Sequence, residues 1–326
     1  MISYYITKPE DVNPYENKAL EEVLISQIKA DQVILYLWQN DNTVVIGRNQ
    51  NAWKECRLEA FAEEKGNLVR RLTGGGAVYQ DLGNQIFTFI APKHLYDLDK
   101  QMEVIRRAAL SFGIKAEKIG RNDVLVDGKK FSGNAFRHTG TASVQHGTLL
   151  ISTDMSKLAK FLNPSKEKLA AKGVTSVRSR VINLCELNPA ITPARMREAL
   201  ITAFQDVYGE VAQPLSEDEI DRNKQAEIAT WLASDEWKLG HLSEFDYEFG
   251  KRFSFGELVF KFSVEQGTIT GIKVYSDALD TDWISGIETA FTGLPFTSVA
   301  MADALPASQA PEDTAEVLTF LKALEW

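Results

Sequence analysis

The amino-acid sequence predicts an α+β fold with two domains. Strand-like apolar stretches follow one another across short polar turns, and helical stretches are scattered between them. This mixture is typical of mixed, largely antiparallel sheets with surrounding helices. The chain has 326 residues, which is enough for two domains, and its acidic residues are concentrated near the C-terminus. We therefore expect a main domain at residues 1–245 and a small α/β domain at residues 246–326.

The first part of the main domain alternates between strands and helices. Asn13 followed by Pro14 is a helix start, and apolar residues then recur at helical spacing. A polar turn, Asn40-Asp41-Asn42, separates two apolar strands. The expected strands are residues 2–6, 33–38, 43–47, 68–72, 77–79 and 85–90, and the expected helices are residues 13–28, 52–64 and 100–112.

The second part of the chain contains a clear hairpin signal. Asp127-Gly128 lies between two strand-like stretches, and Asp154 is placed to cap a helix that ends near residue 162. Residues 163–183 form a long basic segment without a clear period, which predicts a loop. The remaining expected strands are residues 144–152, 257–264 and 267–275, and the remaining expected helices are residues 192–208 and 216–233 and two or three helices before residue 326.

Charge and composition exclude several classes of protein. The net charge is −9, and residues 246–326 contribute −8 of it through 13 acidic and 5 basic residues, which argues against a general nucleic-acid binder. No apolar stretch is long enough to span a membrane, and the N-terminus lacks the pattern of a signal peptide. Two cysteines suggest no disulfide framework. We expect a cytoplasmic protein with no membrane partner.

The stretch RRLTGGGAVY at residues 70–79 is the most unusual feature of the sequence. Three consecutive glycines are costly, because glycine loses the most backbone freedom on folding. Such a run is expected where the backbone approaches a ligand closely or where N–H groups converge on it. The neighbouring Arg70 and Arg71 favour an anion, either a phosphate or a carboxylate. A flexible hairpin turn is the alternative interpretation, and the stretch is not a P-loop.

The arm that follows the Asp127-Gly128 turn carries a second candidate. In a regular strand, Lys130 shares one face with Ser132 and Asn134, whereas Lys129 and Phe131 take the other face. A lysine on a strand is most simply a solvated side chain, and composition alone does not distinguish Lys130 from Lys129.

Six ordered blocks of sequence resemble lipoate–protein ligases. Residues 70–79, with DxGN at residues 81–84 and FTF at residues 87–89, resemble the lipoate-binding loop of that family. Further matches are GRND at residues 120–123, KFSGNAFR at residues 130–137, HGTLL at residues 146–150, LNP at residues 162–164 and KLAAKGVTSVRSRV at residues 168–181. The last block is similar to the family's adenylate-binding loop. The C-terminal segment resembles the accessory domain of the two-domain bacterial form.

The resemblance implies a two-step reaction and a set of site residues. Lipoate and ATP would give lipoyl-AMP, and the lipoyl group would pass to a lysine of an acceptor domain, in an E2 subunit of a 2-oxoacid dehydrogenase or a glycine cleavage H protein. Lys130 would be the catalytic cation, which neutralises the carboxylate and the α-phosphate. The residues implied for ATP or lipoyl-adenylate are Arg71, Gly74, Gly75, Gly76, Ala77, Val78, Tyr79, Lys130, Lys172, Gly173 and Arg178. Those implied for lipoate are Trp38, Val44, Arg71, Gly76, Val78, Lys130, Ser132, His146 and Gly147.

Several of these residues have ordinary structural alternatives. Residues such as Trp38, Val44 and Val78 more often occupy plain core positions, and His146 is equally consistent with a buried, hydrogen-bonded histidine. Asn122 and Asp123 would help to hold Mg²⁺ through the ATP phosphates, or would simply cap a loop.

Two other functions remain open from the sequence. An acyltransferase that moves octanoyl or lipoyl groups through a cysteine thioester needs a reactive thiolate, and neither Cys56 nor Cys185 lies in one of the six blocks. A non-catalytic lipoate-binding protein is the second alternative, and Lys130 argues against it.

Overall fold

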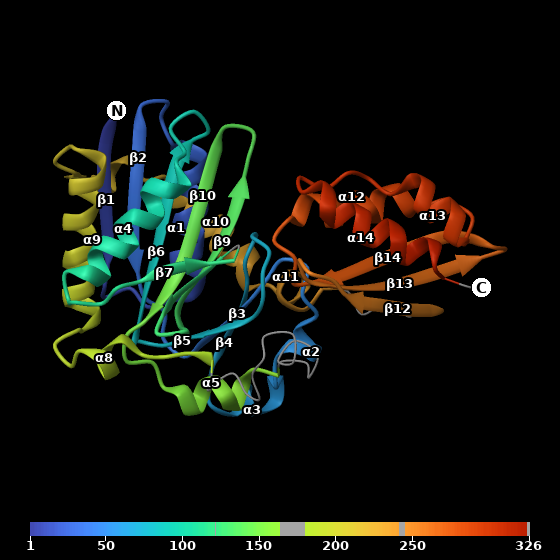
Figure 1. Cartoon of the computed structure of the whole chain (residues 1–326), viewed down its shortest axis with the longest axis horizontal. Coiled ribbons are helices and arrows are strands. Elements are labelled where there is room, and N and C mark those ends of the chain that lie inside the picture. The colour runs from blue at the N-terminus through green and yellow to red at the C-terminus, as the bar shows by residue number, and fades with distance from the viewer. Residues whose placement is uncertain (121, 164–179, 241–244, 325–326) are drawn as a thin grey trace.

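The computed structural model of the chain describes residues 1–120, 122–163, 180–240 and 245–324 (Figure 1). The strands of the main body are β1 (Ile2–Lys8), β2 (Gln32–Trp38), β3 (Thr43–Ile46), β4 (Asn67–Arg70), β5 (Val78–Gln80), β6 (Asn84–Pro92), β7 (Glu117–Ile119), β8 (Asp123–Val126), β9 (Lys129–His138), β10 (Ala142–Leu150) and β11 (Gln213–Pro214). Its helices are α1 (Pro14–Gln27), α2 (Ala52–Glu55), α3 (Leu58–Glu63), α4 (Leu98–Leu110), α5 (Met155–Phe161), α8 (Leu184–Leu187), α9 (Pro193–Tyr208), η1 (Glu217–Glu219), α10 (Arg222–Ala233) and α11 (Asp235–Leu239).

An eight-stranded mixed sheet forms the centre of the main body, in the order β11-β1-β2-β6-β10-β9-β8-β7. β1 runs parallel to β2 and β11, and the other neighbours are antiparallel. Helices α4 and α9 cover one face, and α1 covers the other (Figure 1). Because both faces are covered, every residue of β2 is buried.

A second sheet carries the triple-glycine loop. Its order is β4-β3-β5, with β3 parallel to β4 and antiparallel to β5. The turn at residues 40–42 therefore leads the chain from the large sheet into the small one instead of closing a hairpin. The glycine loop, residues 72–77, likewise joins two strands that lie on opposite sides of β3. A simple hairpin turn at the glycines is thereby excluded.

The C-terminal domain has its own sheet and core. Its strands β12 (Tyr247–Arg252), β13 (Glu257–Glu265) and β14 (Thr268–Ser276) are antiparallel neighbours, and helices α12 (Thr281–Phe291), α13 (Ser298–Ala304) and α14 (Pro311–Lys322) lie along one side of them (Figure 1). One hydrophobic cluster, from Phe253 to Leu321, joins this sheet to these helices. The predicted α+β class is confirmed. The predicted boundary at residue 245 stays a prediction, and residues 241–244 lie outside the described part of the chain.

Two predicted helices are wrong in detail. The helix expected over residues 52–64 is interrupted because Cys56 is extended and forms a β-bridge with Leu162. The helix expected from residue 216 starts only at Arg222, because Ile220 is extended and buried in the core and Asp221 supplies the N-cap. No helix in the described part of the chain has both the length and the apolar composition that a membrane crossing requires.

Candidate active site

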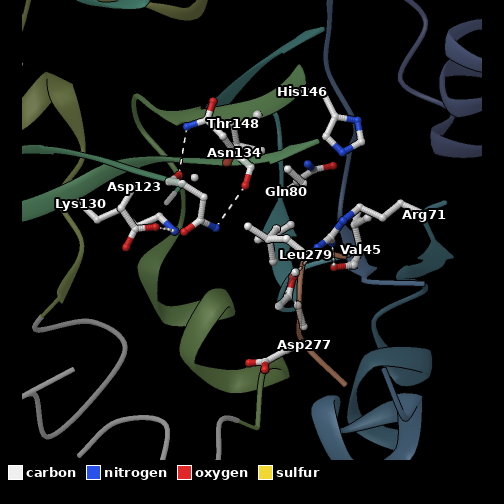
Figure 2. Close-up of a pocket in the computed structure, with 18 of the residues that line it drawn as sticks. Val45, Arg71, Gln80, Asp123, Lys130, Asn134, His146, Thr148, Asp277 and Leu279 are labelled. Atoms are coloured by element: carbon white, nitrogen blue, oxygen red, sulfur yellow. Dashed lines mark hydrogen bonds and ion pairs between the residues drawn. The ribbon is translucent and has the colours of Figure 1, made fainter. Parts of the chain in front are cut away.

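A cavity of about 490 Å³ lies between the two sheets of the main body and the C-terminal domain. The large sheet forms its floor, and Lys18 of α1 and the glycine loop form parts of its walls. Phe253 and Leu279 reach it from the C-terminal domain. Figure 2 shows Lys130 on one side of this space and Arg71 on the opposite side.

Strand register places four lining residues in one row across the large sheet. Gly133 on β9 pairs with Thr148 on β10, Thr148 pairs with Ile86 on β6, and Ile86 pairs with Trp38 on β2. Neighbouring strands are about 4.8 Å apart, so the row is roughly 14 Å long. Its far end, at Ile86 and Trp38, is apolar. An extended molecule with one polar end therefore fits the row with that end over Gly133.

Lys130 stands at the Gly133 end of the row. A Cβ added to Gly133 would lie 2.5 Å from Lys130 Nζ, so the ammonium group fills the space that a side chain would occupy. Nζ also pairs with Asp123 Oδ1 at 2.7 Å, and Arg180 pairs with the other oxygen of that carboxylate. Lys129 is exposed and does not line the cavity. One carboxylate thus holds two cations at the polar end of the cavity.

The predicted face pattern around Lys130 needs a correction. Val124 pairs with Ser132 and Leu125 pairs with Lys130, so β9 has one extra residue, Phe131, opposite β8. This β-bulge breaks the simple alternation. Ser132 lies with Phe131 on the side of the sheet that faces α4 and α9, because its partner Leu149 belongs to that core. Lys130 and Ser132 therefore lie on opposite sides, and Ser132 does not line the cavity.

The glycine loop lies against the C-terminal domain. Gly75 has a φ of 92°, which favours glycine, and its N–H donates to Ala278 O at 3.1 Å. A Cβ on Gly74 would lie 2.8 Å from the backbone of Leu279, and one on Gly47 would collide with the carbonyl of Gly75. Close packing of backbone on backbone is therefore one reason for the glycines.

Arg71 is buried beneath this loop and ties it together. Its guanidinium donates to Thr73 Oγ1 at 3.0 Å and to the carbonyl oxygens of Gly74 and Gly76 at 2.7 and 2.9 Å. It also donates to Val45 O at 3.3 Å. Burial lowers the pKa of Arg71 to about 10, which leaves the group charged at neutral pH. Arg71 lines the cavity, and its contact with an anion stays a prediction.

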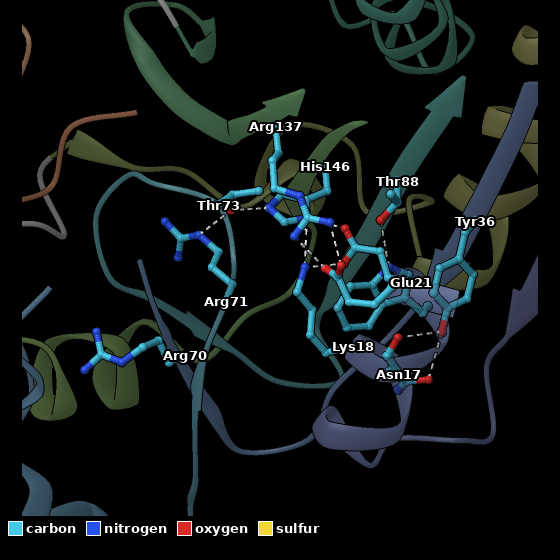
Figure 3. Close-up of polar contacts among 12 residues, drawn as sticks. Asn17, Lys18, Glu21, Tyr36, Arg70, Arg71, Thr73, Thr88, Arg137 and His146 are labelled. Carbon is cyan, nitrogen blue, oxygen red and sulfur yellow. Dashed lines mark hydrogen bonds and ion pairs between the residues drawn. The ribbon is translucent and has the colours of Figure 1, made fainter. Parts of the chain in front are cut away.

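His146 belongs to a buried polar cluster that also includes helix α1 (Figure 3). Its Nε2 lies 2.8 Å from Thr73 Oγ1, and its Nδ1 lies 2.6 Å from Glu21 Oε1. Lys18 pairs with the other carboxylate oxygen of Glu21. Burial lowers the pKa of His146 to about 4, although Glu21 acts in the opposite direction. Burial alone would raise the pKa of Glu21, but His146 and Lys18 outweigh burial and hold it below its usual value.

Most of the residues predicted for ligands meet in the cavity. Its lining includes Trp38, Arg71, Gly75, Gly76, Ala77, Val78, Asn122, Asp123, Lys130, His146 and Gly147. The predicted residues that do not line it are Val44, Gly74, Tyr79 and Ser132. Val44 and Tyr79 face a core on the other side of the small sheet, and the next residue, Val45, lines the cavity instead. Lys172, Gly173 and Arg178 lie outside the described residues.

Other lining residues were not predicted. Lys18 and Arg180 come from the main body, and Arg252, Asp277 and Leu279 come from the C-terminal domain. The sequence contained one indication that helix α1 carries buried polar side chains, because Glu21 interrupts the apolar face of that helix. The C-terminal residues gave no comparable signal, since only the packing of the two domains brings them to the cavity.

The two cysteines are poorly placed for thioester chemistry. Cys56 is buried, and burial raises the pKa of its thiol to about 12. Neither Cys56 nor Cys185 lines the cavity. Within the described residues, no group of three or more His, Cys, Asp or Glu side chains is placed to hold a metal ion.

Solved structures with the same architecture include lipoate ligases. P. falciparum LipL1 in complex with lipoate superposes with a TM-score of 0.86 at 28% identity, covering 98% of each chain. A bipartite lipoate protein ligase of Thermoplasma acidophilum, studied with its E2 lipoyl domain, gives a TM-score of 0.65 at 26% identity over 76% of this chain and all of that chain. A lipoate-protein ligase A bound with ATP, at 24% identity, shares the fold with a TM-score of 0.63 over 74% of this chain and 99% of its own.

Sequence profiles match both parts of the chain. The lipoyl protein ligase A/B catalytic domain matches residues 13–205, and the C-terminus of bacterial lipoate protein ligases matches residues 243–320. The first match alone covers more than half of the chain and includes Lys130 and the glycine loop. The chain therefore belongs to the lipoate–protein ligase family, in its two-domain bacterial form.

Proposed function

We propose that this ligase activates lipoate with ATP to form lipoyl-AMP and then transfers the lipoyl group to a lysine of an acceptor domain. Family membership supports lipoate ligation, and the ATP-bound relative supports a nucleotide site. The observation that carries the proposal is the row from Lys130 to Trp38. It offers a cation for a carboxylate at one end and apolar surface for a tail at the other.

In the first step, a carboxylate oxygen of lipoate attacks the α-phosphorus of ATP and the bond to pyrophosphate breaks. Two anions must approach each other, so a fixed cation lowers the barrier. Lys130 supplies that cation, and Asp123 keeps its ammonium in place through the contact at 2.7 Å. The cavity is partly closed from water, which strengthens this interaction.

In the second step, the neutral amine of the acceptor lysine attacks the acyl carbonyl. The new C–N bond forms an amide, the C–O bond to AMP breaks, and the nitrogen loses one proton to solvent. Lys130 polarises the carbonyl, and no nucleophile of the enzyme is required because the adenylate is already activated. The proposed acceptors are lipoyl domains of E2 subunits and the glycine cleavage H protein. The archaeal relative described with its E2 lipoyl domain supports the first of these.

We also propose Mg²⁺ as a cofactor that enters with ATP. Asn122 and Asp123 line the cavity next to Lys130, and oxygen ligands of this kind are the ones that Mg²⁺ prefers. The ion would offset the charge of the ATP phosphates. Because both oxygens of Asp123 already contact cations, the phosphates would have to supply most of the ligands. A cytoplasmic location is proposed as well, and it agrees with two unpaired cysteines.

The direct test is lipoate-dependent exchange of pyrophosphate into ATP. Purified protein with lipoate, ATP and Mg²⁺ should show exchange without any acceptor, since the adenylate forms before transfer. A cysteine acyltransferase would show none and would instead accept acyl groups from a donor protein. The burial of Cys56 and the position of both cysteines outside the cavity disfavour that alternative.

A further inference from the structure

A continuous chain of five buried polar side chains runs from helix α1 to the glycine loop (Figure 3). Its members are Lys18, Glu21, His146, Thr73 and Arg71, and each is at most 7% exposed. Burying such groups is unfavourable unless they are fully hydrogen-bonded. This series of five buried side chains therefore requires a structural or functional reason.

The chemistry of the groups fixes the direction of each hydrogen bond. Arg71 can only donate, so Thr73 Oγ1 accepts from Nε of Arg71 at 3.0 Å. At the other end the Glu21 carboxylate can only accept, so His146 Nδ1–H donates to Glu21 Oε1 at 2.6 Å. Lys18 Nζ lies 3.3 Å from the same Nδ1 and cannot donate to it, because that nitrogen carries the proton. Burial keeps the ring neutral, so Nε2 carries no proton and the Thr73 hydroxyl donates to it at 2.8 Å. Lys18 donates to the second oxygen of Glu21 and balances its charge.

Arg71, the last of these five side chains, holds the glycine loop. Arg71 binds the carbonyl groups of Gly74 and Gly76, so its position fixes the backbone on both sides of Gly75. Both ring nitrogens of His146 are engaged within the chain. The histidine thus contacts the cavity with its ring and has no free nitrogen with which to bind or deprotonate a ligand.

We propose that Glu21, His146 and Thr73 are positioning residues that hold Arg71 and the glycine loop in the arrangement required for adenylation. Glu21 selects the Nδ1–H form of His146, this form requires Thr73 to donate, and Thr73 in turn can only accept from Arg71. The activity part of this inference rests on the proposed function, whereas the state of the imidazole can be measured without any activity.

Nitrogen-15 NMR of histidine-labelled protein tests the imidazole directly. The chain has four histidines, and the signals of His146 are identified by their loss in His146→Gln. We expect the Nδ1–H form at all pH values from about 5.5 to 8.5, because Glu21 disfavours the Nε2–H tautomer and burial disfavours the doubly protonated ring. The charged groups nearest the ring are Lys18, Glu21, Arg71 and the Glu22–Arg137 pair beside it. An Nε2–H form at neutral pH, or titration near pH 6.5, would overturn the proposal.

Two substitutions of Thr73 test the consequence for activity. Thr73→Val keeps the shape and removes the hydroxyl, so we expect pyrophosphate exchange to fall roughly five- to tenfold, with its effect on kcat and not on KM for ATP. Thr73→Ser keeps the hydroxyl and should remain within about twofold of the wild type. Equal rates in the two variants would contradict the proposal. If the wild type shows no exchange, the proposed function fails, and the NMR result still decides the hydrogen-bond order.

Discussion

The Gly133→Ala substitution should displace the side chain of Lys130 without destabilising the fold, so it tests whether the position of Lys130 matters for activity. The new Cβ would lie 2.5 Å from Nζ and 2.8 Å from Cε of Lys130, whereas ordinary contact begins at about 3.4 Å. The ammonium must therefore move by roughly 0.9 Å. Gly133 does not have the positive φ that favours glycine, and the atoms in its way belong to the end of a flexible side chain. The fold should accept the methyl group while Lys130 loses its place.

A displacement of about 1 Å in a catalytic group can cost roughly a hundredfold in rate. We expect a loss of this size in lipoate-dependent pyrophosphate exchange by Gly133→Ala, with a melting temperature close to that of the wild type. Gly140→Ala is the matched control, because nothing lies within 4 Å of its added Cβ and its φ is also not positive. Exchange by Gly133→Ala within twofold of the control, in folded protein, would refute the role given to the position of Lys130.

Three further predictions concern single side chains. Lys130→Ala should lower exchange roughly a hundred- to a thousandfold, and Lys129→Ala should have little effect; similar losses in both variants would mean that the wrong lysine is assigned. Cys56→Ala and Cys185→Ser should both retain acyl transfer to an acceptor domain, and loss of transfer by either folded variant would favour the thioester mechanism. The folded pKa of His146, about 4, lies below its ordinary value of 6.5, so the unfolded state binds more protons between these pH values. The free energy of unfolding should therefore decrease by at most about 3 kcal/mol as the pH falls through this window, and urea titrations of His146→Gln should lack that decrease.

The sequence predicted Lys130 as the catalytic lysine, and the structure places it in the cavity, but the geometry that directs its side chain was not predicted. The Asp127-Gly128 turn and the two strands around it were predictable from turn chemistry. The β-bulge at Phe131 was not predicted, although Gly133 is an isolated glycine within that arm and such a glycine can mark a bulge. Alternation therefore placed Ser132 beside Lys130, whereas Gly133 is its true neighbour. Pairing between strands settles the face of a side chain, and a single sequence does not contain that information.

Charged residues on buried helix faces were also missed. Helix α1 was predicted from Asn13 and Pro14, and the structure has the same start, with Asn13 as its N-cap. Lys18 and Glu21 were assigned no function, because charged side chains on helices are usually solvated. Their partner His146 lies 125 positions beyond Glu21 in the sequence, so only the completed sheet shows that these residues meet.

The central claim is that ATP activates the acyl group before transfer, and one mass-spectrometric experiment tests it. The protein is first mixed with lipoate, ATP and Mg²⁺, an apo lipoyl domain is then added, and lipoyl-AMP, AMP and the modified lysine are quantified before and after this addition. We predict lipoyl-AMP before the acceptor is added, and then one AMP released for each lipoylated lysine, with no product when ATP is omitted. A modified acceptor without ATP, or an acyl group bound to Cys56 or Cys185 during turnover, would contradict the account.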